Sequence, residues 1–178
     1  MKRRLTPRDM AHIAIFAALI AICAWLSLPT VIPVTLQTFA FFLAAFLLGG
    51  RKGSICVVVY LLLGVIGLPV FSFFRGGPAA LFGATGGYLL GFIPAALLLW
   101  LLEKWVQNHP LRRLFAALAA LSVCYAFGTL WYAAFYLESS ASLRTVFASC
   151  VLPFLLPDFL KLLLALFLSS RLNIRSDL

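Results

Sequence analysis

Charge is scarce in this chain of 178 residues, and acidic charge is the scarcest. Asp and Glu together number 5, and charged residues of both signs make up 11% of the sequence. The four cysteines form no CxxC pair and no cluster with a histidine, so the sequence offers no zinc-type ligand set. A phosphate-binding loop ending in GKS or GKT is also missing. We therefore predict no metal site, no cofactor and no use of ATP by the chain itself.

Apolar residues are what the chain has in excess. They make up 64% of the sequence, with a mean hydropathy of +1.09, whereas soluble domains average about 45–50%. A membrane-spanning helix needs about 20 mostly apolar residues. The sequence therefore predicts an all-α polytopic membrane protein in which residues 1–178 form one membrane domain. Its six expected spans are Ala11–Leu28, Leu36–Leu48, Ser54–Leu68, Tyr88–Leu102, Leu114–Tyr136 and Thr145–Ser170.

The net charge of +9 is distributed unevenly between the connections. Only Arg75 and Arg144 fall in the odd-numbered connections. The remaining cations outside the spans flank the termini or the even-numbered connections: Lys2, Arg3, Arg4, Arg8, Arg51, Lys52, Lys104, Arg112, Arg113, Arg171 and Arg175. This positive-inside pattern predicts cytoplasmic N- and C-termini. It leaves no basic patch interleaved with aromatics, so no nucleic-acid partner is expected.

Two charges interrupt the last apolar segment. Asp158 and Lys161 are the only charged residues between Arg144 and Arg171. Each costs roughly 2.5–3.5 kcal/mol at mid-bilayer on insertion scales, and a spacing of i, i+3 places them on one helix face. They form either a structural ion pair that fixes the helix or one wall of a ligand site. About 20 Å of helix separates Asp158 from Arg171, which places the pair in the outer half of the membrane.

Prolines and glycines mark the segments expected to shape such a site. Pro153 and Pro157 are predicted to break the last helix beside the charged pair, a layout found in transporter binding sites. The glycine-rich connection 67–88 would either present backbone N–H groups to a ligand or let helices pack closely. Thr35 and Gln37 follow a proline-rich turn, where they would bind a ligand or cap the next helix. No Ser/Lys pair and no paired aspartates lie within the spans, so an enzyme is not expected.

Small residues line one side of the first expected helix. Ala14 and Ala18, and likewise Ala17 and Ala21, form small-xxx-small patterns that allow close approach of another helix. These alanines either pack within the bundle or form a docking face for a separate subunit.

Four segments together resemble the BioY family, the biotin-specific S component of energy-coupling factor (ECF) transporters. The segment 33–39 (PVTLQTF) is similar to the family's P-[VI]-T-x-Q-T motif, and 67–72 (GLPVFS) to its G-x-PVF motif. The segment 83–89 (GATGGYL) resembles GPTGGYL, and 153–161 resembles P-F-x-x-x-D-x-x-K. Two departures are Ala84, where the family commonly has proline, and Phe73-Phe74-Arg75, where smaller residues are usual.

The resemblance implies an S-component fold of six helices in a prokaryotic cell membrane, in contact with its lipids. It implies biotin uptake, with docking through helix one onto an EcfT-type transmembrane coupling subunit that carries two ABC-type ATPases. An S component for another vitamin, thiamine or riboflavin, and a solitary carrier remain alternatives. The expected substrate-binding residues are Asp158, Lys161, Tyr88, Gly86, Gly87, Thr85, Phe71, Ser72, Phe74, Arg75, Thr35 and Gln37.

The chemistry of these residues suits biotin. Asp158 is an acceptor that matches the ureido N–H groups, and Lys161 is a donor for the ureido oxygen or the carboxylate. Phe71, Phe74 and Tyr88 would enclose the apolar bicycle. Arg75 is either a partner for the ligand carboxylate or an ordinary surface cation. The sequence leaves open which end of biotin Lys161 meets.

Overall fold

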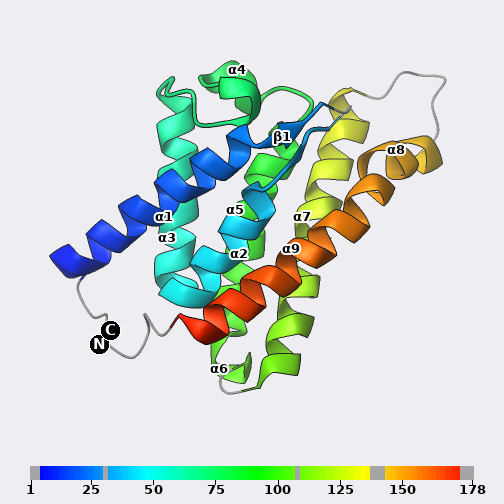
Figure 1. The fold of residues 1–178 in the computed structure, drawn as a ribbon. Coiled ribbons are helices and arrows are strands. Elements are labelled where there is room, and N and C mark those ends of the chain that lie inside the picture. The colour runs from blue at the N-terminus through cyan, green and yellow to red at the C-terminus, as the bar shows by residue number, and fades with distance from the viewer. Residues whose placement is uncertain (1–4, 30–31, 107–108, 137–142, 173–178) are drawn as a thin grey trace.

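The structure is a computed structural model that describes residues 5–29, 32–106, 109–136 and 143–172. Helices form most of it (Figure 1). They are α1 (Pro7–Trp25), α2 (Gln37–Leu48), α3 (Gly50–Val65), α5 (Gly86–Leu101), α7 (Pro110–Phe135), α8 (Leu143–Cys150) and α9 (Leu152–Arg171). Shorter elements are the hairpin β1 (Ser27–Leu28) and β2 (Val34–Thr35), the 3₁₀ helix η1 (Ser72–Phe74), α4 (Pro78–Leu81) and α6 (Glu103–Val106). The predicted flanking cations Lys2, Arg3, Arg4 and Arg175 lie outside the described residues.

The first helix begins and ends at positions set by local chemistry. Thr6 accepts a hydrogen bond from the backbone N–H of Asp9 at 3.2 Å, and the Asp9 carboxylate accepts one from the Thr6 N–H at 3.0 Å. This capping box starts α1 before the expected Ala11. At the other end, Ser27 pairs with Thr35 across the β1–β2 hairpin, so α1 stops at Trp25 rather than Leu28.

The last predicted span is divided into two helices, α8 and α9. The break lies at Val151, which separates α8 from α9 with φ −124° and ψ −52°. Pro153 stands in the first turn of α9, where a missing N–H costs nothing. Pro157 lies inside α9, which continues through it to Arg171. The prediction that Pro157 interrupts this helix is therefore wrong.

One hydrophobic core joins α1, α2, α3, α5, α7 and α9. Small residues allow the helices to approach closely, most clearly between α5 and α7. A Cβ added to Gly87 would collide with Trp131, and one added to Gly128 would collide with the ring of Tyr88. In Figure 1, α2 lies among α1, α5 and α9, so that residues from distant parts of the chain surround it.

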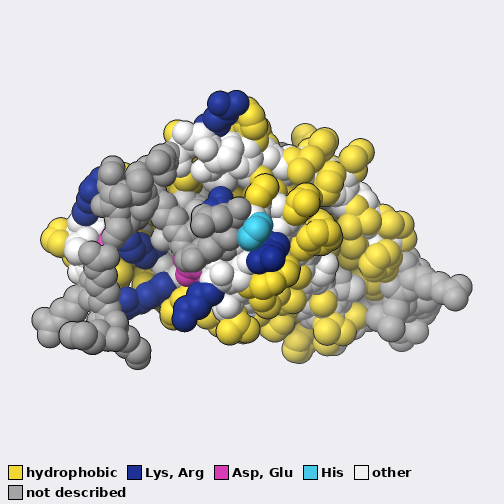
Figure 2. Space-filling view, turned by 90° about the horizontal axis from the view of Figure 1, so that it is seen from below, with side chains coloured by type: hydrophobic (Ala, Val, Ile, Leu, Met, Phe, Trp, Pro, Cys, Tyr) yellow, Lys and Arg dark blue, Asp and Glu magenta, His cyan; other side chains and the backbone are white. Residues whose placement is uncertain are grey.

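The helices have the composition of a membrane protein. Among the described residues, three segments are long and apolar enough to cross a membrane: Pro7–Trp25, Pro110–Phe135 and Val146–Arg171. The helices α2 and α5 are apolar but shorter. Large apolar side chains are exposed on several of them, including Ile15, Leu130 and Leu156. Figure 2 shows Lys and Arg side chains gathered at the end of the molecule that carries α6. The starts of α1, α3 and α7 and the end of α9 lie at that same end.

Candidate ligand-binding site

A buried ion pair stands near the middle of α9. The Lys161 Nζ donates to Oδ1 of Asp158 at 2.7 Å, as the i, i+3 spacing predicts. Asp158 is 3% exposed and Lys161 is 8% exposed. A buried charge needs a partner because its desolvation is costly. The two charges therefore stabilise each other where α9 faces the other helices.

A tyrosine on α7 supplies the second donor to the same carboxylate. The Tyr125 hydroxyl donates to Oδ2 of Asp158 at 2.6 Å. Each carboxylate oxygen thus accepts one short hydrogen bond, one from α9 and one from α7. Sequence reasoning missed Tyr125, because a tyrosine within an apolar helix carries no signal comparable to a charge. Its separation of 33 residues from Asp158 also hides the contact.

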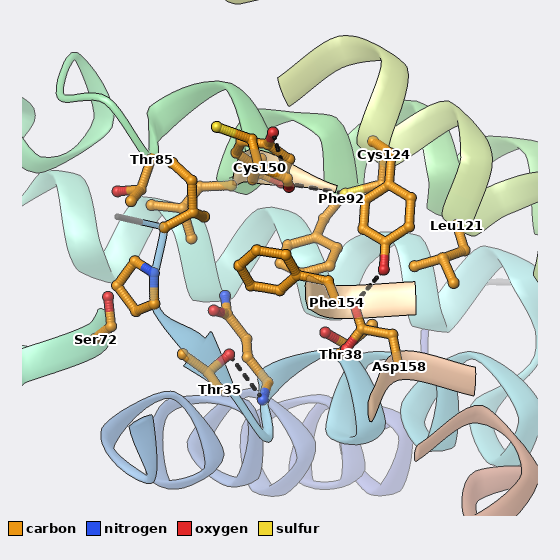
Figure 3. A pocket seen from close by; sticks show the side chains of 16 residues that line it. Thr35, Thr38, Ser72, Thr85, Phe92, Leu121, Cys124, Cys150, Phe154 and Asp158 are labelled. Carbon is orange, nitrogen blue, oxygen red and sulfur yellow. Dashed lines mark hydrogen bonds between the residues drawn. The ribbon is translucent and has the colours of Figure 1, made fainter. Parts of the chain in front are cut away.

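Asp158 and Tyr125 line a small inner cavity of about 70 Å³ (Figure 3). In the figure, Asp158 and Thr38 stand at one side of the cavity, and Ser72 and Thr85 stand at the opposite side. Aromatic and aliphatic side chains fill most of the wall between them. The complete lining is Ile32, Pro33, Thr35, Gln37, Thr38, Ser72, Thr85, Tyr88, Leu89, Phe92, Leu121, Cys124, Tyr125, Cys150, Phe154 and Asp158.

An outer cavity of about 420 Å³ adjoins the inner one. Four residues line both cavities: Pro33, Ser72, Thr85 and Leu89. The rest of the outer wall comes from the segment that holds η1 and α4, and it includes Phe71 and the exposed Arg75. Together the cavities offer an acidic inner end, an apolar middle and a basic outer end. Such an arrangement fits an amphipathic small molecule with a hydrogen-bond donor at one end and an anion at the other.

Thr35 and Gln37 both line the inner cavity, but their polar groups are also used within the protein. The Thr35 hydroxyl accepts from the backbone N–H of Gln37 at 3.2 Å, which gives one orphan amide of α2 a partner. The Gln37 side-chain amide donates to the Tyr60 hydroxyl at 3.0 Å, and Tyr60 donates to the Val70 carbonyl at 3.1 Å. Thr35 therefore both supports the start of α2 and lines the cavity, whereas the Gln37 side chain lines the cavity and bonds to α3 instead of capping α2.

The aromatic residues expected to enclose a ligand are distributed differently. Phe71 is buried, packs edge-on against Tyr60 and lines the outer cavity. Phe74 lines neither cavity; it is 62% exposed and stacks on Trp25 with ring centroids 4.9 Å apart. The Trp25 indole N–H also donates to the carbonyl of Pro69 at 2.8 Å. These contacts hold the segment that contains η1, which lines the outer cavity, against the end of α1.

In the glycine-rich connection, Gly76 and Gly83 line the outer cavity, but the two predicted site glycines do not line the inner one. Thr85 and Tyr88 line the inner cavity, whereas Gly86 and Gly87 do not. The backbone N–H of Gly86 bonds to the carbonyl of Gly83 at 2.9 Å, and that of Tyr88 to the carbonyl of Thr85 at 3.1 Å. Gly87 packs against α7. The structure thus places both glycines in packing positions, away from the cavity lining.

Lys161 holds Asp158 but does not line either cavity. The alanines of α1 separate into two faces. Ala17 and Ala21 are buried in the core, at 1% and 6% exposure. Ala14 and Ala18 lie on the exposed face. The first small-residue pattern is therefore available on the surface, and the second packs within the bundle.

Comparison with known proteins agrees with this architecture. The family model described as the BioY family matches residues 1–177. The chain is 39% identical over 167 residues to "Biotin transporter BioY" of Thermotoga maritima, covering 93% of this chain and 96% of that protein. It is 34% identical over 167 residues to "Probable biotin transporter BioY" of Pyrococcus horikoshii, with the same two coverages.

A solved structure has the same fold. It is the crystal structure of the S component for biotin from an ECF-type ABC transporter, which matches with a TM-score of 0.83 and 26% sequence identity. The match covers 94% of each chain. The resemblance expected from four short motifs therefore extends over almost the whole length and the whole fold. The chain belongs to the BioY family.

Proposed function

We propose that this chain is the biotin-binding membrane subunit of a biotin uptake system. The observation that carries the proposal is the cavity that ends on a buried carboxylate, Asp158, held by Lys161 and Tyr125. The names of the relatives support biotin as the ligand and transport, rather than catalysis, as the activity.

The two cavities favour one orientation of the ligand. The inner cavity alone, at about 70 Å³, is smaller than the ~300–1,000 Å³ typical of ligand sites. Biotin would therefore occupy both cavities, and the shared residues Ser72 and Thr85 would separate to admit it. Its ureido N–H groups suit the acceptor Asp158, and its carboxylate suits Arg75 at the outer end. Lys161, which lies outside the cavity lining, would then contact Asp158 rather than the ligand.

The proposal extends to the membrane and to partners. Residues 1–178 would form one membrane domain with six spans and cytoplasmic termini. The gathering of cations at the α6 end supports this orientation. The exposed Ala14–Ala18 face of α1 would dock onto an EcfT-type coupling subunit with two ABC-type ATPases, which would supply the energy.

A ligand titration tests the proposal directly. The protein is purified in detergent and titrated calorimetrically with biotin, thiamine and riboflavin. We expect tight binding of biotin and none of the other two. Binding of thiamine or riboflavin without biotin would contradict the ligand assignment and leave an S component for a different vitamin. Biotin uptake in cells that lack every ECF ATPase would contradict the coupling and indicate a solitary carrier.

A further inference from the structure

Of the two residues that donate a hydrogen bond to Asp158, one lines the inner cavity and the other does not. Tyr125 and Asp158 line the inner cavity, whereas Lys161 lines neither cavity. Both Tyr125 and Lys161 nevertheless donate to Asp158, at 2.6 Å and 2.7 Å. On the basis of the proposed function, we infer that Tyr125 contacts the bound ligand together with Asp158, and that Lys161 is a positioning residue that acts through Asp158.

The hydrogen-bond capacity of the pair defines what it presents to a ligand. An ionised carboxylate has about four acceptor sites, of which Tyr125 and Lys161 each occupy one. The phenol uses its only hydrogen on Asp158, so its oxygen can offer a ligand only acceptor lone pairs. The edge formed by Tyr125 Oη and Asp158 Oδ2 therefore offers acceptors alone. It selects a ligand that places an N–H donor there, as one ureido nitrogen of biotin does.

This arrangement also explains why the tyrosine matters for specificity. A ligand without the N–H would leave the remaining acceptor site of this buried edge unsatisfied, which is costly. Tyr125 holds Oδ2 in place from α7, while Lys161 holds Oδ1 from α9. The ligand-reading edge is thus formed by residues of two separate helices, α7 and α9.

The test of Tyr125 combines a protein variant with altered ligands. Biotin and its two derivatives methylated on one ureido nitrogen are titrated against the unsubstituted protein, Tyr125→Phe and the control Tyr132→Phe. Tyr132 lies two turns further along α7 and lines neither cavity. We expect Tyr125→Phe to weaken biotin binding at least about tenfold and Tyr132→Phe to leave it unchanged. Methylation of one ureido nitrogen should weaken binding to the unsubstituted protein more than methylation of the other. For that derivative, the loss of affinity relative to biotin should be at least about threefold smaller in Tyr125→Phe.

The test of Lys161 separates positioning from contact. Lys161→Met should weaken biotin and both methylated derivatives by the same factor, because it disturbs Asp158 without removing a ligand contact. Lys161→Arg, which keeps a donor for Asp158, should restore binding. A change in the ratio of the affinities in Lys161→Met would instead show that Lys161 touches the ligand, and would overturn that part of the inference.

The outcomes distinguish this inference from the proposed function. If the unsubstituted protein binds biotin and Tyr125→Phe binds it equally well, or with the same penalty for methylation, the inference is wrong and the proposed function stands. If the unsubstituted protein does not bind biotin, the proposed function fails, and the assignment of Tyr125 fails with it. Circular dichroism of each variant confirms that the helices remain folded, so that a loss of affinity reports on the site.

Discussion

Asp158 shows how a single carboxylate is stabilised in apolar surroundings. Each of its oxygens accepts one short hydrogen bond, from Lys161 on the same helix and from Tyr125 on another. Removing one partner of a buried pair costs about 3–5 kcal/mol because the remaining charge is left uncompensated. A buried carboxylate that is held by two donors and also lines a cavity is well suited to bind a donor on a ligand. The two carboxylate oxygens thus link α9 to α7 and are also placed at the wall of the cavity.

Asp158→Asn tests the charge of this residue with little change of shape. Asparagine keeps one acceptor but replaces the other oxygen with an N–H₂ group, which would confront either the Tyr125 donor or the Lys161 donor. We expect the variant to lose at least about tenfold in biotin affinity, measured by calorimetry in detergent. Glu103→Gln, which removes an acidic charge at the α6 end, is the control and should bind normally. Full affinity in Asp158→Asn would return the ion pair to a purely structural role.

At the scale of helices, the length of each apolar segment predicts the helix boundaries better than individual residues do. The long apolar segments gave five helices to within a few residues, because burial along a whole helix outweighs any one position. Pro157 was misread as a break, since a proline this near the start of α9 leaves most of its hydrogen bonds intact. Tyr125 was not found, because the partner that gives it a role lies on a different helix. Local sequence thus predicts elements well and contacts between elements poorly.

Gly87 provides a test of how α5 meets α7. An added Cβ would collide with Trp131 and would come within 3.1 Å of the Cα of Gly128. Because backbone cannot move aside cheaply, we expect Gly87→Ala to destabilise the protein by about 1–3 kcal/mol. Gly83→Ala is the control in the same turn, because its nearest neighbours are carbonyl oxygens at 3.4 Å. Thermal unfolding in detergent measures both. Equal melting temperatures for Gly87→Ala and the unsubstituted protein would contradict the close packing of these helices.

At the scale of the whole molecule, the two ends differ in chemistry. The cavities open among the hairpin, η1 and α4, while Lys and Arg gather at the end that carries α6. The exposed face of α1 runs between these ends, with Ala14 and Ala18 beside exposed Ile15 and Ile22. A surface of small side chains lets another helix approach closely. It lies apart from the cavity lining, so ligand binding and partner docking should be separable by mutation.

Ala18→Trp tests that separation. A large ring on the exposed face should prevent close approach of a coupling subunit without touching either cavity. We expect unchanged biotin affinity in detergent and a loss of most biotin uptake in cells that supply the coupling subunit and ATPases. Leu130→Trp, at a position 68% exposed on α7, is the matched control and should transport normally. Ala17→Trp should behave differently from both, because Ala17 is buried at 1% exposure and overpacking there should lower the melting temperature. Normal uptake by Ala18→Trp would show that the partner docks on a different face.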